Sequence, residues 1–252
     1  MAKYRDTFPE IGTDRVFLSD GGIMTEFFFS DETKNMVVPN NNIFFPLMED
    51  STFMNWMDKF YKKYMDLCLK ENKEFGFILI SFLTYKARKE DIKTQFDIDE
   101  QRWIQMNKVH IQYLVNLRTE YETSIPNCPP ILVSGLIIPK GGHGDAFSLD
   151  TKMSIKESEE YHTSQIKVFT EDTKVDFVMV ALVTYSEEAI GILNMAAGFK
   201  LPVVISYTTE VDGRLPSGET VKVCKIGLAL VHEKYYIGLQ PKHLIKRYYI
   251  FI

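Results

Sequence analysis

The sequence predicts an α/β fold of the TIM type, a (β/α)8 barrel with about six βα units present and the carboxyl-terminal units missing. Short β-rich runs alternate with longer helical patterns along the 252 residues, which is typical of βαβ units and a parallel sheet. An open doubly wound sheet would share this alternation. Its dinucleotide-binding glycine pattern is absent, however, because Gly21 and Gly22 are not followed by G-x-x-G. We therefore favour the barrel.

Six apolar or β-branched runs, each bounded by turn residues, are expected to form strands. They lie near residues 16–19, 76–82, 131–136, 176–183, 202–207 and 235–239. A closed barrel needs eight strands, and after the sixth run only the segment "RYYIFI" could supply another. The sequence thus predicts an open barrel whose unpaired edges invite self-association.

Three of the segments between these runs carry sequence features that predict helices. Ser154 and Glu157 form a capping box, in which both side chains bind otherwise unpaired backbone amides. The segment 186–198 begins with two acids in its first turn, where the helix dipole favours negative charge. In the segment 51–73, apolar residues recur every three or four positions and predict one apolar face. This face consists of Phe53, Trp56, Phe60, Tyr64 and Leu67.

The composition predicts a globular chain. A hydrophobic content of 45% can build a real core, so residues 1–252 are expected to form a single, incomplete barrel domain. The net charge of -5 and the lack of a basic block argue against a nucleic-acid partner. No apolar signal region or membrane-length apolar run is present, so we expect a cytoplasmic protein without membrane association.

Three cysteines, Cys68, Cys128 and Cys224, are an odd number and have no C-x-x-C spacing. Such a set argues against a disulfide framework and against a compact zinc knuckle. We expect buried free thiols.

Asp20 is the first candidate for a binding residue. It directly follows the apolar run "VFLS" and precedes Gly21 and Gly22, which allow a sharp turn. Ligands of α/β folds bind at the carboxyl ends of strands, which is where this acid is expected. The alternative is a turn acid or helix cap.

Six blocks of sequence resemble the homocysteine S-methyltransferase family, in the same order and spacing from about residue 16 to 236. They are "FLSDGGIMTEFFF", "FGFILISFLTYKA", "SGLIIPKGGHGDAF", "SIKESEEYHTSQIKVF", "TYSEEAIGI" and "LPVVISYTTEVDGRLPSG". The resemblance implies a barrel that binds homocysteine and transfers a methyl group to its thiol, giving methionine. It also implies a zinc ion that holds the thiol as the reactive thiolate. The methyl donor stays open among S-methylmethionine, S-adenosylmethionine, betaine and a folate or cobalamin carrier.

The resemblance also implies substrate-binding residues. Asp20, in the D-G-G motif with Gly21 and Gly22, would lie beside the amino-acid part of homocysteine. Thr84 and Tyr85 match a T-Y pair that faces the site. Another candidate is Glu187, although Glu187 and its neighbour Glu188 also suit a helix start.

The zinc ligands of the family are missing from this sequence. The family uses one cysteine after the sixth strand and an adjacent pair near the carboxyl terminus. Here Gly238 and Leu239 stand where the first is expected, and no cysteine follows Cys224. A fourth-strand glutamate of some branches is replaced by Ala181. No metal ligand and no catalytic residue is therefore assigned.

Other candidates carry less weight. His143 and Asp145 in "GGHGD" could form an anion nest or a metal site, but a solvated loop is the favoured interpretation. His162 is expected to be a surface or packing residue of a helix. A substitute zinc site of Cys224, His232 and His243 has no known spacing to support it.

Two functions stay open. The first is a thiol methyltransferase acting on a homocysteine-like thiol. The second is a metal-free, inactive remnant that at most binds a small amino acid, because without a metal a thiol near neutral pH is mostly protonated.

Overall fold

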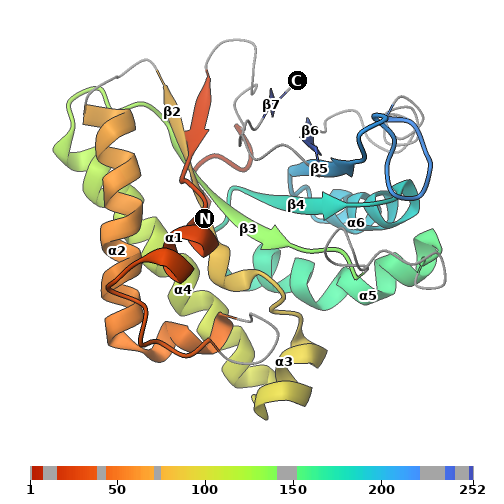
Figure 1. Cartoon of the computed structure of the whole chain (residues 1–252), viewed down its shortest axis with the longest axis horizontal. Helices are drawn as coiled ribbons and strands as arrows, with labels where there is room; N and C mark the ends of the chain where they lie inside the picture. Colours follow the sequence, from red (N-terminus) through yellow and green to blue (C-terminus); the bar gives the residue numbers. More distant parts are fainter. Residues whose placement is uncertain are drawn as a thin grey trace. The chain divides into compact units, whose positions relative to one another are not determined.

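The computed structural model describes residues 2–7, 16–38, 44–70, 75–140 and 152–221, and the backbone alone of 236–241 and 250–251. The chain divides into two compact units, whose helices and strands are labelled in Figure 1. The first comprises Met1–Gly135 with Asp172–Asp176, and the second comprises Leu136–Glu171 with Phe177–Ile252.

The first unit contains three parallel strands. β1 (Phe17–Ser19) pairs with β2 (Gly76–Ile80), and β2 pairs with β3 (Ile131–Ile137), which runs two residues past the unit boundary. The helical segments of this unit are α1 (Ile23–Phe29), η2 (Phe45–Glu49), α2 (Ser51–Met65), η3 (Asp66–Lys70), η4 (Phe82–Thr84), α3 (Lys89–Phe96) and α4 (Glu100–Ser124).

Aromatic rings build much of the core beside α1 and α2. The ring of Phe27 lies edge-on to those of Phe44 and Trp56, with centroid distances of 5.1 Å and 5.4 Å. Trp56 in turn stacks on Phe60 at 5.6 Å. Rings in these arrangements gain energy beyond the burial of their area, so this cluster fixes α1 against α2.

The apolar face expected for 51–73 is correct only in its first part. Phe53, Trp56 and Phe60 are buried, whereas Leu67 is 61% exposed. The reason is that the α-helical backbone gives way to a π-helix, η3, from Asp66 onward. The wider π turn rotates later residues around the axis, so that Cys68 is buried in place of Leu67. Burial raises the pKa of the Cys68 thiol to about 11, as suits a free structural cysteine.

The second unit contains β4 (Phe177–Val183), β5 (Val203–Thr209) and β6 (Tyr236–Pro241), which are parallel. A short β7 (Ile250–Phe251), from the end of "RYYIFI", pairs antiparallel with β6. The helical segments are α5 (Ile155–Lys167), η7 (Val168–Asp172) and α6 (Ser186–Gly198).

Close packing of α5 against α6 depends on a glycine. A Cβ atom at Gly191 would lie 2.5 Å from Ser158 Oγ and 2.7 Å from the carbonyl oxygen of Ile155. The absence of a side chain therefore lets the two helices approach. The expected capping box of Ser154 and Glu157 is confirmed at the start of α5.

All six strands expected from the sequence are present, with ends within two residues of those predicted. In the described part of the chain, no helix combines the length and the apolar character needed to cross a membrane.

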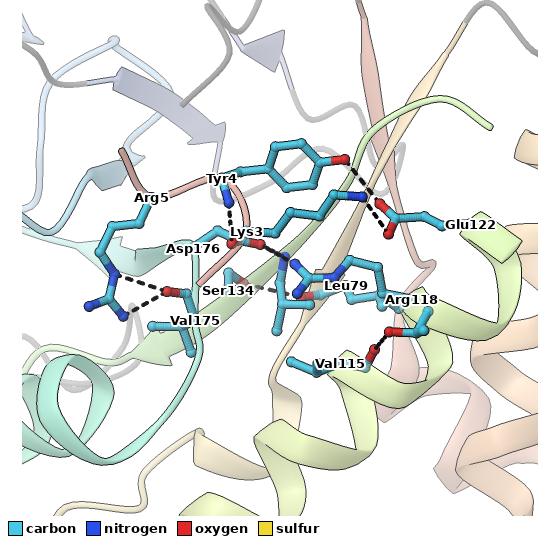
Figure 2. Close-up of polar contacts among 12 residues, drawn as sticks. Lys3, Tyr4, Arg5, Leu79, Val115, Arg118, Glu122, Ser134, Val175 and Asp176 are labelled. Atoms are coloured by element: carbon cyan, nitrogen blue, oxygen red, sulfur yellow. Dashed lines mark hydrogen bonds and ion pairs between the residues drawn. The ribbon is translucent and has the colours of Figure 1, made fainter. Parts of the chain in front are cut away.

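A buried ion pair joins three segments of the first unit (Figure 2). Arg118 Nη1 of α4 donates to Asp176 Oδ2 over 2.7 Å, and both side chains are almost fully buried. The same carboxylate accepts the backbone N–H groups of Tyr4 and Val133, each at 2.9 Å. Arg5 adds two hydrogen bonds to the carbonyl oxygen of Val175. The amino-terminal segment is thereby fastened to β3 and α4.

Replacing Arg118 with methionine should leave the buried Asp176 carboxylate without the cation that is hydrogen-bonded to it. We expect the free energy of unfolding to fall by about 3–5 kcal/mol, measured by urea denaturation. Arg102→Met is the matched control on the same helix, because Arg102 pairs with Glu49 where both side chains are more than half exposed. It should change stability by less than about 0.5 kcal/mol. Equal losses in the two variants would contradict a structural role for the buried pair.

Candidate functional site

Asp20 lies where β1 ends, immediately before the turn into α1, and is only 7% exposed. Its carboxyl group forms no ion pair with any residue that the structure describes. Burial raises its pKa to about 8, and the only opposing contribution is a hydrogen bond from its own backbone. A cation placed beside a carboxyl group buried in this way strongly stabilises its ionised form.

Tyr61 lies close to the same acid. Its hydroxyl donates to the carbonyl oxygen of Ile80 over 2.5 Å, at the carboxyl end of β2. Burial, and then the negative charge of Asp20, raise the pKa of the Tyr61 phenol. The phenol therefore stays neutral near Asp20.

The two glycines after Asp20 are explained by backbone packing. A Cβ atom at Gly21 would lie 2.1 Å from the hydroxyl oxygen of Tyr64. Gly22 precedes the first residue of α1 with a φ of -73°, which other residues also adopt. Gly21 thus serves the close approach of Tyr64, and neither glycine has the left-handed backbone that would demand this residue type.

Thr84 and Tyr85 follow β2 and are both buried. The Thr84 hydroxyl donates to the carbonyl oxygen of Ser81 over 2.8 Å, and the Tyr85 ring stacks on Phe82 at 5.9 Å. Asp20, Thr84 and Tyr85 all belong to the first unit and follow the carboxyl ends of two paired strands.

Ser81 is a polar residue at this strand end that the sequence analysis missed. It is fully buried, and its hydroxyl has no hydrogen-bond partner among the described residues. Because β1, which ends at Ser19, pairs in parallel with β2, which ends at Ile80, Asp20 and Ser81 both directly follow the carboxyl ends of neighbouring strands. The available signal was a serine directly after the apolar run "GFILI".

Glu187 and Glu188 begin α6 in the second unit and have different environments. Glu187 is partly exposed and pairs with Lys152 Nζ at 2.6 Å. Glu188 is fully buried, accepts the backbone N–H of Lys140 at 2.7 Å, and lies 3.0 Å from His162 Nε2. His162 is accordingly a buried packing residue with a polar partner.

The amino end of α6 is capped from a distant loop. Its N-cap residue makes no side-chain hydrogen bond. The carboxylate of Glu219 instead accepts from the backbone N–H of Ser186 at 3.1 Å and from the Ser217 hydroxyl at 2.7 Å. Although burial opposes ionisation, these donors leave the pKa of Glu219 below its ordinary value.

Ala181, the position of the missing glutamate, lies in a bulge of β4. The pairing with β5 shifts register between Val180 and Val183, and Leu182 adopts a left-handed φ of 67°. A non-glycine residue in that region is strained. The end of β4 is therefore irregular where some family members would bind substrate.

The described residues contain no group of three or more histidine, cysteine or acidic side chains that could hold a metal ion. Cys224, His232, His243 and the segment "GGHGD" lie outside the described residues. The part of the chain that the structure describes therefore does not fit the zinc that the resemblance implies.

Asp20→Asn should stabilise the protein at neutral and alkaline pH. The pKa of Asp20 rises from 3.8 to about 8 on folding, so the folded state holds this proton more tightly. The wild-type protein should lose stability relative to the variant as pH rises from about 4 to 8, by up to about 1.4 kcal/mol per unit of pKa difference. Thermal unfolding across this pH range measures the stability difference between the two proteins. Asp31→Asn is the control, because the side chain of Asp31 is 97% exposed. A constant difference at all pH values would contradict a neutral buried Asp20.

The fold is similar to that of the homocysteine methyltransferase MmuM from Escherichia coli. The metallated form of that protein gives a TM-score of 0.72 at 14% identity, over 90% of this chain and 75% of that chain. The oxidized form gives 0.72 at 15% identity, over 90% and 74%, and the apo form 0.65 at 14%, over 90% and 72%. No protein-family model and no curated protein matches the sequence. The comparison confirms an α/β fold that corresponds to part of a TIM-type barrel.

Proposed function

We propose that this chain is a homocysteine S-methyltransferase-like protein that binds homocysteine, or a similarly small amino thiol, through Asp20. The observation that carries the proposal is a buried carboxyl group at a strand end, with no cation beside it among the described residues. An α-ammonium group supplies that cation. It favours the ionised carboxylate and offsets its desolvation.

The fold supports this assignment of the site. Enzymes with TIM-type barrels carry their active sites at the carboxyl ends of the strands, and Asp20, Thr84 and Tyr85 follow such ends. MmuM, whose fold is similar, is a homocysteine methyltransferase. The proposed reaction is methyl transfer to the homocysteine thiol, giving methionine, with a methyl donor that the site does not specify.

A second function, binding without turnover, is favoured by the residues around the site. A methyl acceptor must lose its thiol proton, and the described residues provide no metal site to promote this. The chain would then bind the amino acid and leave its thiol protonated.

The remaining parts of the proposal concern organisation and partners. We propose that residues 1–252 act as a single barrel-type domain in the cytoplasm. In the described part of the chain β1 pairs only with β2, and Val16 and Leu18 are exposed at this edge. An unpaired apolar edge strand supports self-association with a second copy of the chain.

Binding and metal content can be measured on the same dialysed sample. Homocysteine should bind the wild-type protein and Asp31→Asn equally, while Asp20→Asn should weaken binding at least tenfold, which equals about 1.4 kcal/mol. Elemental analysis with and without homocysteine separates the two functions. Stoichiometric zinc would support methyl transfer, and zinc near zero would support binding alone. Equal affinity of all three proteins would exclude Asp20 from the site.

A further inference from the structure

The loop that follows β5 folds into a compact flap, which comprises residues 210–220. Two tight turns shape it, in which the N–H groups of Gly213 and Gly218 donate to carbonyl oxygens three residues earlier, at 3.0 Å and 2.8 Å. Both glycines have left-handed φ values, of 78° and 85°, which other residues rarely adopt. The N–H groups of Glu210 and Leu215 also donate to carbonyl oxygens of the flap, at 2.7 Å and 2.9 Å. The flap therefore keeps its shape through its own backbone hydrogen bonds.

The flap is fastened to the rest of the second unit beside the start of α6. The N–H of Ser217 donates to the carbonyl oxygen of Thr184, the residue after β4, over 3.3 Å. The Glu219 carboxylate accepts from the backbone N–H of Ser186 at 3.1 Å and also from the Ser186 hydroxyl. The positive charge of Lys152 further favours the ionised carboxylate. Glu219 thus joins the flap to the helix through a charged side chain.

Two buried hydroxyl groups lie at the ends of β4 and β5. The two strands are paired as far as Val183 and Tyr207, and the residues that follow these are Thr184 and Thr208. Thr184 is 1% exposed and Thr208 is 4% exposed, and neither hydroxyl has a hydrogen-bond partner in the part of the chain that the structure describes. A buried hydroxyl without a partner is costly. Entry of water or of a ligand to these strand ends would remove that cost.

We infer that the flap is a lid over the carboxyl ends of β4 and β5, and that Glu219 is the latch that holds it closed. Release of the Glu219 carboxylate from Ser186 frees the flap, and the open state offers partners to the hydroxyls of Thr184 and Thr208. TIM-type barrels bind their ligands at this end of the strands, and lids over such sites open as local units of low stability. All these residues lie in the second unit, so the inference does not depend on Asp20 or on homocysteine.

Amide hydrogen exchange measured by NMR can follow the lid. The N–H of Ser217 reports opening, because its acceptor is the carbonyl oxygen of Thr184, which lies outside the flap. The N–H groups of Gly213 and Gly218 report the internal bonds of the flap, which stay intact when it moves as one piece. Comparison of the three amides therefore separates opening of the lid from local unfolding of the loop.

Glu219→Gln should open the latch, because the neutral amide binds the Ser186 donors more weakly than the carboxylate does. We expect exchange at Ser217 to become about tenfold faster, while exchange at Gly213 and Gly218 stays within about twofold of the wild-type rate. Glu160→Gln is the matched control, since Glu160 is exposed on α5 of the same unit. It should change none of the three rates.

Thr184→Val tests the buried hydroxyl in the opposite direction. Valine keeps the shape of the side chain and removes the group that opening would hydrate, so exchange at Ser217 should become about threefold slower or more. Circular dichroism establishes that each variant is folded.

Three results would overturn the inference. An unchanged rate at Ser217 in Glu219→Gln would mean that Glu219 is not the latch. Equal acceleration at Ser217, Gly213 and Gly218 would mean that the loop unfolds and is not a lid. Faster exchange at Ser217 in Thr184→Val would mean that the hydroxyl favours the closed state.

Discussion

The buried carboxylate of Asp176 is the contact on which the first unit depends. It receives Arg118 from α4, the N–H of Val133 from β3 and the N–H of Tyr4 from the amino-terminal segment. Desolvation raises the pKa of Asp176, and the Arg118 charge and the two amides oppose that rise. The acid tolerates burial because three donors replace its water. Strand, helix and amino-terminal segment are thereby fixed to one another.

Asp20 is buried to a similar degree and has none of these compensations. No ion pair or amide from another residue offsets its burial in the described part of the chain. Folding alone would favour an uncharged residue there, so the acid is retained at a cost in stability. Such costs are typical of sites that gain from a ligand. The contrast between the two aspartates is the physical basis for assigning a stabilising role to Asp176 and a binding role to Asp20.

Local patterns in the sequence were enough to predict the strands and the α5 capping box, because both depend on neighbouring residues. The exposure of Leu67 was not predictable from helical spacing, since the change to a π-helix at Asp66 alters the spacing itself. Contacts between residues far apart in the sequence could not be predicted either. Arg118 meets Asp176 and His162 meets Glu188 only once the fold has formed. For the same reason the sequence suggested Asp20 but not Ser81, whose position at the neighbouring strand end depends on the pairing of β1 with β2.

The central claim is that Asp20 receives the ammonium group of an amino thiol, and proton release on binding tests it most directly. Homocysteine should be titrated near pH 7 by calorimetry in two buffers that differ in ionisation enthalpy. A carboxyl group with a pKa of about 8 is mostly protonated at that pH, and the ammonium group should expel its proton. We predict a release close to one proton for the wild-type protein and markedly less for Asp20→Asn. Equal release by both proteins would assign the proton to another group and contradict the account.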